Sequence, residues 1–450
     1  MKILWLCNFM LPAVAEHLHQ KATNKEGWIS GMAEVILKRS KSNDVQLGVA
    51  FPVSEDMDGY REELEVFGGK LTCYGFYEDS AHPENYDERL EEKMRKITDD
   101  FKPDVIHCYG TEYSHTLAMC KAYPDKQKLL ISIQGLCSVY ANTYYADLPQ
   151  KVIKNITFRD WLKKDSLTQQ KDKYVSRGTY EIEAVKLSGN VAGRTAWDAF
   201  YTAAWNKDVK YYHLNETLRS CFYEDMWDAD KAKAHTIFLS QGNYPIKGLH
   251  YMLMALPKIK TKYPDVKVFV AGDSVIKYET WKDKIKISAY GRYLRQLIQR
   301  YNLEDNVSFL GSLTAEQMKQ QYLSSSLFVC PSTIENSPNS LGEAMLLGVP
   351  CVSADVGGIS SIFTDGKDGI LYPGFRTKDN AFDRPYVKEG NVYALEENAN
   401  ALAEAVLTMW EDSQKQRMYC ENAAAHAKET HDREKNYRRM LEIYADIKNA

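Results

Sequence analysis

The sequence predicts an α/β protein of two doubly wound domains, each with a parallel sheet covered by helices on both faces. Three observations support this class. Short apolar runs of strand length alternate with amphipathic stretches of helical period, the order typical of parallel sheets with crossover helices. The pattern runs twice along the chain, with a polar break near residues 214–234. The chain also has 450 residues, enough for two domains that each bury a core.

Nine apolar runs predict the strands, at residues 2–7, 46–51, 104–109, 129–133, 236–240, 267–271, 307–310, 327–330 and 351–354. Helical period appears between them, for example at residues 249–263 and 314–325, and again in the charged tail from about residue 397. The first run has the length of a strand and is interrupted by Asn8 and Pro12. We therefore expect a first strand there and not a secretory leader.

We expect an N-terminal domain at residues 1–214 and a C-terminal domain at residues 215–429. The last helix, at about 430–450, either closes the second domain or packs back on the first, because periodicity does not distinguish these cases. Ligands of doubly wound sheets bind beyond the carboxyl ends of the strands. The sequence therefore predicts a site in a cleft between the two domains.

Composition excludes several functional classes. The chain is 44% hydrophobic and 26% charged with a formal net charge of −4, so nucleic acid is not an expected partner. Its nine cysteines show no CxxC spacing, which predicts a reducing, cytoplasmic location without disulfides or zinc. No apolar stretch is long enough for a membrane span.

The stretch ENSPNSLGE places Glu335 before a predicted helix and Glu343 inside it. Pro338 precedes the first turn, so backbone N–H groups should point from the helix start, together with the positive end of its dipole. Such a start binds phosphate. Two carboxylates beside it would suit the hydroxyls on either side of a diphosphate, as in a nucleotide sugar. Alternatively, Glu343 only complements the helix dipole and Glu335 is a solvated loop residue. The expected N–H donors are those of Asn339, Ser340 and Leu341.

A second stretch, FLSQGNYPIKGLHYMLM, combines a strand, a turn and Lys247-Gly248 at the start of a helix. A lysine at a strand-to-helix turn can neutralise a diphosphate leaving group without a metal. Gly272-Asp273 and Gly311 end two further strands. The Asp228-Ala229-Asp230 triplet precedes a strand, so we do not interpret it as a metal site.

Taken in this order, the motifs resemble the retaining glycosyltransferases of family 4, which have the GT-B fold. The resemblance covers residues 236–373. It is carried by the E-x7-E pair, by the GEAMLLGVPCVSADVGGISSIFTDGKDGILYP stretch from residue 342 and by Lys247-Gly248. In the first half only the layout is similar, with a PDVIH stretch at residues 103–107.

The resemblance implies that Glu335 and Lys247 are catalytic and that Glu343 binds the ribose. It implies a UDP- or GDP-sugar donor, no metal cofactor, and a leaving phosphate that helps to deprotonate the acceptor. The donor-binding residues it implies are Asn243, Lys247, Gly248, Asp273, Gly311, Glu335, Ser337, Asn339, Ser340, Leu341 and Glu343.

Two positions depart from the family pattern. Asn243 stands where the family usually has an arginine, a loss of about 2–3 kcal/mol of charge-assisted phosphate binding unless another cation replaces it. Arg194 is the candidate replacement, or alternatively a salt-bridge partner. Gln134 stands where many members have a histidine; it can hydrogen-bond a sugar but cannot take a proton.

Two further segments concern the acceptor. Glu112 and His115 follow a strand and are candidate acceptor contacts, or alternatively only the start of the next helix. Residues 151–177 are basic and interleaved with aromatics. They either lie on an anionic bilayer, at the inner face of the membrane where a lipid-linked acceptor resides, or form a solvated helix.

The sequence thus predicts an enzyme that transfers a sugar to a saccharide or lipid-linked saccharide, in surface polysaccharide biosynthesis. Two alternatives remain open. One is a non-catalytic sugar-nucleotide-binding protein of the same fold, suggested by Asn243 and Gln134. The other is a phosphorylase or epimerase that uses the same cleft.

Overall fold

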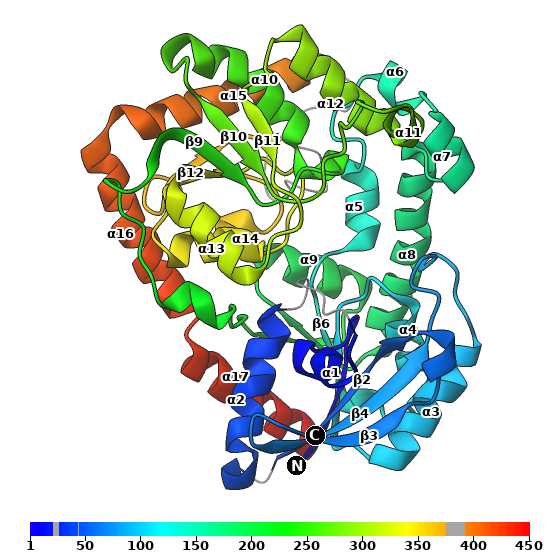
Figure 1. Cartoon of the computed structure of the whole chain (residues 1–450). Helices are drawn as coiled ribbons and strands as arrows, with labels where there is room; N and C mark the ends of the chain where they lie inside the picture. Colours follow the sequence, from blue (N-terminus) through cyan, green and yellow to red (C-terminus); the bar gives the residue numbers. More distant parts are fainter. Residues whose placement is uncertain (21–26, 44, 375–391) are drawn as a thin grey trace. The chain divides into compact units, whose positions relative to one another are not determined.

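The computed structural model describes residues 1–20, 27–43, 45–374 and 392–450 (Figure 1). The chain divides into two compact units. The first unit comprises Met1–Ser138, Lys173–Arg219 and Thr430–Ala450, and the second comprises Val139–Asp172 and Ser220–Glu429. The division at residues 219 and 220 lies close to the expected boundary, but residues 139–172 belong to the second unit and 430–450 to the first.

The first unit contains an eight-stranded sheet in the order β3-β4-β2-β1-β5-β6-β7-β8. Neighbouring strands pair in parallel except for β3 and β4, which form an antiparallel hairpin. The strands are β1 (Lys2–Leu6), β2 (Gln46–Val53), β3 (Arg61–Val66), β4 (Gly69–Tyr77), β5 (Val105–Tyr109), β6 (Leu129–Ser132), β7 (Asn190–Gly193) and β8 (Lys210–His213).

Helices pack on this sheet and close its core, which includes Trp5, Phe51 and Tyr444. In Figure 1 the last helix, α17 (red), runs beside α2 (dark blue), and α17 also contacts β5. The helices of the first unit are α1 (Pro12–His17), α2 (Gly27–Asn43), α3 (Arg89–Phe101), α4 (Ser114–Ala122), α9 (Ala196–Trp205) and α17 (Arg433–Asn449).

The second unit contains a six-stranded sheet in the order β11-β10-β9-β12-β13-β14, with all pairs parallel. Its strands are β9 (Lys233–Leu239), β10 (Lys267–Val270), β11 (Val307–Phe309), β12 (Ser325–Cys330), β13 (Cys351–Ala354) and β14 (Ile370–Tyr372). Its helices are α6 (Gln150–Ile153), α7 (Phe158–Lys163), α10 (Leu249–Lys262), α11 (Trp281–Lys286), α12 (Ala289–Arg300), α13 (Ala315–Ser324), α14 (Asn339–Leu346) and α15 (Val392–Glu411).

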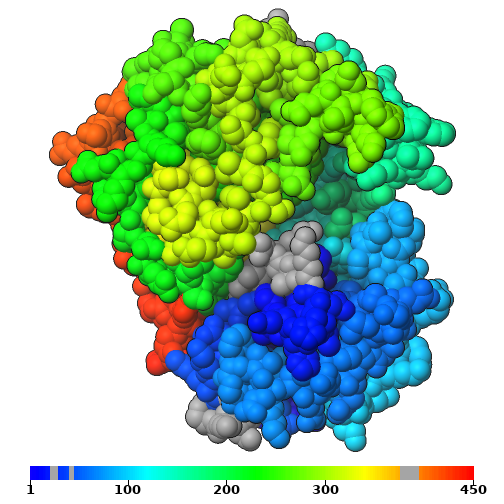
Figure 2. Space-filling model, viewed as in Figure 1, coloured from blue at the N-terminus to red at the C-terminus, as the bar shows by residue number. Residues whose placement is uncertain are grey.

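Three helices contain the points at which the chain passes from one unit to the other: α5 (Cys137–Thr143), α8 (Leu167–Leu187) and α16 (Ser413–Thr430). On the face drawn in Figure 2, the surface of the second unit comes mainly from the middle of the chain (green to yellow). Among the described residues, no helix is both long and apolar enough to cross a membrane.

All nine expected strands are present, and the class of two parallel α/β sheets is confirmed. The sequence did not predict five further strands, β3, β4, β7, β8 and β14. In β3, the sequence REELEV leaves only Leu64 buried, because an edge strand faces water. The sequence signal that could have located the hairpin is the glycine pair Gly68-Gly69 at its turn, where Phe67 and Gly68 have positive φ in the structure.

Candidate functional site

The strand order of the second unit defines where a ligand should bind. From β9 the chain continues to β10 and β11 on one side, and later to β12, β13 and β14 on the other. The order therefore reverses between β9 and β12, the kind of switch point at which loops part and leave room for ligands. The two motifs singled out in the sequence follow these two adjacent strands.

A glycine allows the loop after β9 to pack closely against the loop after β12. Gly248 has a φ of +71°, and a Cβ at this position would lie 1.8 Å from the carbonyl oxygen of Pro331. Only glycine meets both conditions. The Thr333 N–H, which donates to the Ile246 carbonyl at 2.8 Å, joins the loops a second time. Lys247 is therefore positioned by the backbone on either side of it.

These contacts bring together the two expected catalytic side chains. Lys247 Nζ lies 2.5 Å from Glu335 Oε1 and donates a hydrogen bond to it across 88 residues of sequence. Both side chains are mostly but not fully buried. Burial opposes the charge of Lys247, but the Glu335 carboxylate outweighs burial and raises the lysine pKa well above its ordinary value.

Glu335 is held in place from two further directions. Its Oε1 also accepts a hydrogen bond from Ser332 Oγ at 2.7 Å. Its backbone carbonyl accepts from the Gly358 N–H at 2.9 Å. A Cβ on Gly357, where φ is +56°, would lie 2.0 Å from the same carbonyl oxygen. The carboxylate is thus preorganised and not a solvated loop group.

The start of α14 has the unpaired N–H groups expected there, with one correction. Pro338 is the N-cap residue, and no side chain caps the helix. Leu341 is not a free donor, because its N–H donates to the Pro338 carbonyl at 3.0 Å. Of the three expected groups, the N–H groups of Asn339 and Ser340 have no acceptor among the described residues. The buried Asn339 Oδ1 also lacks a partner there.

Glu343 is buried one turn further along α14. Its Oε2 lies 3.4 Å from the hydroxyl of Tyr322, which also donates to the Ser340 carbonyl at 2.9 Å. Tyr322 thereby links the first turn of α14 to the glutamate. Ser337, in the loop before α14, is half-buried.

The remaining residues expected to bind the donor lie at the ends of neighbouring strands. Asn243 follows β9 and Asp273 follows β10, and both are exposed. Gly272 and Gly311 form a bridge in which the Gly272 N–H donates to the Gly311 carbonyl at 2.8 Å. These groups line the same carboxyl edge of the second sheet.

The first unit has its own switch point, between β1 and β5. Glu112 lies there, where its Oε2 accepts from Asn8 Nδ2 at 3.3 Å and its Oε1 accepts from the Gly135 N–H at 3.3 Å. Arg177 Nε donates to the Glu112 carbonyl at 2.8 Å. Burial raises the pKa of Glu112, against the opposing effect of these partners.

His115, the second expected acceptor contact, is fully buried. It lies in the first turn of α4, where Nδ1 is 2.7 Å from Glu78 Oε2 and Nε2 is 3.1 Å from Asn8 Oδ1. The structure thus agrees with the alternative interpretation of His115, which placed it at the start of the next helix.

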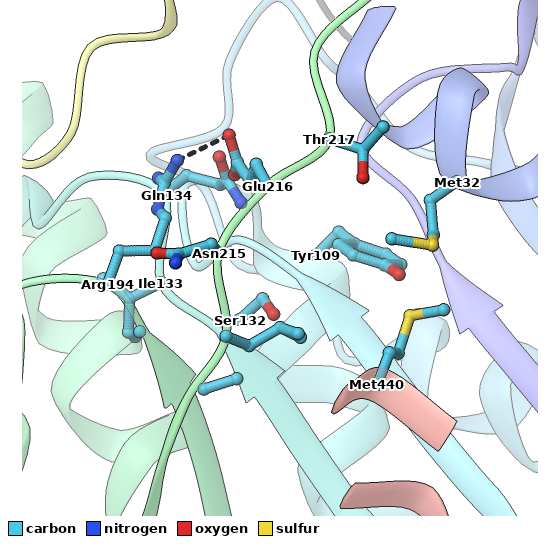
Figure 3. Close-up of a pocket in the computed structure, with 13 residues that line it drawn as sticks. Met32, Tyr109, Ser132, Ile133, Gln134, Arg194, Asn215, Glu216, Thr217 and Met440 are labelled. Carbon is cyan, nitrogen blue, oxygen red and sulfur yellow. Dashed lines mark ion pairs between the residues drawn. The ribbon is translucent and has the colours of Figure 1, made fainter. Parts of the chain in front are cut away.

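Gln134 and Arg194 line one small pocket at the ends of β5, β6 and β7. Figure 3 shows them with Glu216 on one side and Met32, Tyr109 and Met440 on the other. Arg194 Nη1 lies 2.5 Å from Glu216 Oε2, and both are buried. The volume of about 30 Å³ holds roughly two water molecules and no sugar. Arg194 thus has the salt-bridge role that the sequence left open.

Three residues that hydrogen-bond to the expected site residues belong to no motif in the sequence: Asn8, Ser332 and Tyr322. Asn8 directly follows the apolar run of β1, so a polar residue at a strand end was a usable signal. The described residues contain no cluster of three or more His, Cys, Asp or Glu that could hold a metal ion.

Comparison with known proteins shows that this chain is similar to glycosyltransferases. A family model described as glycosyl transferases group 1 matches residues 223–384. An uncharacterized glycosyltransferase of Methanocaldococcus jannaschii is 30% identical over 356 residues, which are 76% of this chain and 80% of the relative.

Solved structures agree on the fold. Sucrose-phosphate synthase of Thermosynechococcus elongatus has a TM-score of 0.69 at 15% identity, covering 99% of each chain. Anabaena HepE, in complex with UDP-glucose, has a TM-score of 0.62 at 16% identity, covering 99% of this chain and 100% of HepE.

The fold is thus that of the GT-B glycosyltransferases, as predicted, with two Rossmann-like domains. The M. jannaschii relative extends the match from the domain to most of the chain. The chain belongs to the glycosyl transferases group 1 family.

Proposed function

We propose that this glycosyltransferase is a retaining enzyme of the family 4 type, which moves a sugar from a UDP- or GDP-sugar to a saccharide or lipid-linked saccharide. One observation carries the proposal. Lys247 and Glu335, from two motifs far apart in the sequence, lie 2.5 Å apart at the switch point of the second sheet. A cation and a carboxylate at this position suit a diphosphate and a sugar hydroxyl.

Lys247 supplies the positive charge that the reaction needs. Breaking the bond between the sugar C1 and the diphosphate oxygen leaves negative charge on the diphosphate, and a fixed ammonium group stabilises that charge. The raised pKa of Lys247 keeps this group protonated at neutral pH. The proposal therefore requires no metal cofactor.

The other proposed donor contacts come from residues at the same carboxyl edge of the second sheet. Asn339 and Ser340 offer N–H groups to phosphate at the start of α14, supported by the helix dipole. Glu335 accepts from a hydroxyl of the transferred sugar, and Glu343 accepts from the ribose. Ser337 and the residues at the strand ends complete the donor site: Asn243, Gly248, Asp273 and Gly311.

The contacts of Glu335 bear on how a retaining step would proceed, because they disfavour a covalent intermediate on this carboxylate. This carboxylate is already engaged by Lys247 and Ser332, so it serves better as a fixed acceptor than as a nucleophile. In the proposed step the acceptor oxygen bonds to C1 on the same face of the sugar from which the diphosphate leaves, as the C1–O bond to the diphosphate breaks, and the acceptor proton passes to the leaving phosphate. The UDP-glucose bound by HepE supports a UDP-sugar as donor.

The proposal assigns acceptor recognition to the first unit. Glu112 lies at the switch point of that sheet, oriented by Asn8 and Gly135, and remains half-exposed. It can accept a hydrogen bond from an acceptor hydroxyl. A saccharide acceptor of this kind fits surface polysaccharide biosynthesis.

A non-catalytic sugar-nucleotide-binding protein is the second candidate. It is favoured by Asn243, which is neutral where the family 4 pattern has an arginine, and by the pairing of Arg194 with Glu216. In that case the chain would bind the donor without turning it over.

The test compares nucleotide release and nucleotide binding. UDP release from UDP-glucose is measured with saccharide acceptors, with inorganic phosphate and with neither, for the wild type, Glu335→Gln and Lys247→Ala. Each substitution should lower acceptor-dependent release by roughly 100-fold or more. Lys258→Ala, which breaks a surface ion pair with Glu404 in the same unit, is the matched control and should keep wild-type rates.

Wild-type rates in Glu335→Gln or Lys247→Ala would refute the site. Tight UDP binding without release under any condition would support the non-catalytic candidate. Release that depends on phosphate, or a changed sugar nucleotide without any acceptor, would indicate a phosphorylase or an epimerase.

A further inference from the structure

Helix α7 has an inverted pattern of burial. Its only buried residue is Asp160, at 1% exposure. Phe158, Trp161 and Leu162 are 55%, 67% and 64% exposed, and Ile156 just before the helix is 62% exposed. A helix on a soluble surface usually buries its apolar side chains and exposes its charges. This helix presents its apolar side to the outside.

Polar contacts on the opposite side fix this orientation. Thr157 and Asp160 form a capping box at the start of the helix. Asp160 Oδ2 also accepts a hydrogen bond from the Ala289 N–H at 2.9 Å, at the start of α12. Arg159 pairs with Asp165 at 2.8 Å. The buried carboxylate therefore anchors α7 so that the apolar side chains cannot turn inward without breaking it.

A second helix extends the exposed apolar surface. In Figure 1, α7 and α11 lie side by side at the edge of the second unit, and the two helices are in contact. Trp281 and Ile285 are 68% and 38% exposed. They are four residues apart and thus share one face of α11. The helix buries none of its residues.

The surroundings of this surface are basic. Exposed lysines flank both helices at Lys151, Lys154, Lys163, Lys164, Lys277, Lys282, Lys284 and Lys286. The carboxylates nearby are mostly engaged: Asp160 holds α12, Asp165 pairs with Arg159, and Asp283 caps α11. We call these lysines, with Ile156, Phe158, Trp161, Leu162, Trp281 and Ile285, the apolar-basic patch.

We propose that the apolar-basic patch binds the surface of an anionic lipid bilayer. Tryptophan prefers the boundary between headgroups and hydrocarbon, and apolar side chains beside it gain by entering that layer. Lysines around the apolar centre reach the phosphates of anionic lipids while their stems cover hydrocarbon. A protein partner would need a matching acidic rim, whereas an anionic bilayer supplies one everywhere.

The structure indicates a different set of residues for the bilayer contact than the sequence did. The expected segment was residues 151–177, but several of its later cations have partners within the protein. Lys173 lies 3.5 Å from Glu84, and Arg177 donates to the Glu112 carbonyl at 2.8 Å. The proposed bilayer contact is therefore limited to residues 151–164 of that segment. It also includes residues 277–286, for which no such indication came from the sequence. It does not depend on the proposed reaction.

Vesicle sedimentation tests the proposal. The full chain is mixed with vesicles of phosphatidylcholine alone and with vesicles that also contain phosphatidylglycerol. We expect binding only to the anionic vesicles, weaker at high salt. Lys163→Glu with Lys164→Glu should weaken it by roughly fivefold or more per lysine replaced. Trp161→Ser with Trp281→Ser should abolish it while keeping the wild-type melting temperature.

Two control variants match these changes elsewhere on the surface. Phe200→Ser removes another half-exposed aromatic ring, and Lys367→Glu with Lys428→Glu reverses two other exposed charges. Both should bind like the wild type. The proposal is overturned if the wild type binds neither vesicle, or both equally, or if the controls lose as much binding as the patch variants. It is also overturned if analytical ultracentrifugation shows a dimer that the two tryptophan substitutions dissociate.

Discussion

Lys247 and Glu335 share a partly buried position, and neither charge would be stable there alone. Removing a lysine from water is costly, and a carboxylate within hydrogen-bonding distance offsets that cost. The pair also leaves the ammonium group held at one place before any donor binds. A group fixed in advance needs no reorganisation when charge develops on a leaving diphosphate.

Gly248 makes the pairing possible, which gives a prediction at this residue. Gly248→Ala should lose roughly 1–3 kcal/mol more stability than a control alanine, because its Cβ would meet the Pro331 carbonyl. Gly366→Ala is the control: its φ of +69° imposes the same backbone strain, but nothing lies within 4 Å. Chemical denaturation of the three proteins measures the difference. Equal losses in both variants would show that the contact with Pro331 is unimportant.

At the scale of residues, the sequence indicated candidates where a motif exists and did not indicate contacts that depend on the fold. Lys247 and Glu335 were both named, and they meet. Ser332 and Tyr322 carry no signal of their own, because only the tertiary structure brings them to the glutamates. Leu341 was expected to be a free donor, but the first turn of α14 is tight enough for its N–H to donate to the Pro338 carbonyl three residues back, which the sequence does not reveal.

Helix α17 contacts residues that are far from it in the sequence. Its Tyr444 hydroxyl accepts from the Trp5 indole Nε1 at 2.9 Å and lies 2.6 Å from His107 Nδ1. These residues belong to β1 and β5, in the middle of the first sheet. The last helix of the chain thus satisfies polar groups in the core of the first unit.

Tyr444→Phe tests the importance of this anchor. The change leaves two buried polar groups without the hydroxyl and should cost about 1–3 kcal/mol for each, in the free energy of unfolding of the first unit. Glu442→Gln on the same helix removes an exposed partner of Arg439 and should change stability little. Comparable losses in the two variants would contradict a buried anchor.

Buried strands could be predicted from the sequence more easily than exposed ones. Strands with apolar runs, such as β1 and β12, were found with nearly correct bounds. The charged edge strand β3 was missed because its pattern reflects water on its exposed side. The sequence left the place of α17 open, since an amphipathic helix shows which face it buries and not against what.

At the scale of the whole molecule, each unit buries a neutral histidine. His107 in the first unit contacts Tyr444 and Ser132, and His250 in the second contacts Tyr290 and the Ala146 carbonyl. Burial lowers the pKa of each to about 3. An unfolded chain takes up these protons near pH 6.5, so the folded state is favoured above that pH and loses stability as the pH falls toward 3.

Each histidine should therefore make the free energy of unfolding fall by about 1.4 kcal/mol per pH unit below its unfolded pKa. His107→Gln and His250→Gln should each flatten this dependence by that amount, whatever constant stability they lose. Denaturation curves between neutral and mildly acidic pH measure the slope. A variant with the wild-type slope would show that its histidine is protonated in the folded state.

The organisation into two α/β units was predictable because the strand-helix pattern repeats along the chain. The assignment of residues 139–172 to the second unit was not, because it rests on distant contacts such as Asp160 with Ala289 and His250 with Ala146. No local pattern in the segment reveals those partners.

A crystal structure with UDP-glucose tests the central claim most directly. The account predicts the diphosphate beside Lys247 Nζ and the N–H groups of Asn339 and Ser340, the glucose near Glu335 and the ribose at Glu343. A donor bound at any other place, with these groups unoccupied, would contradict it.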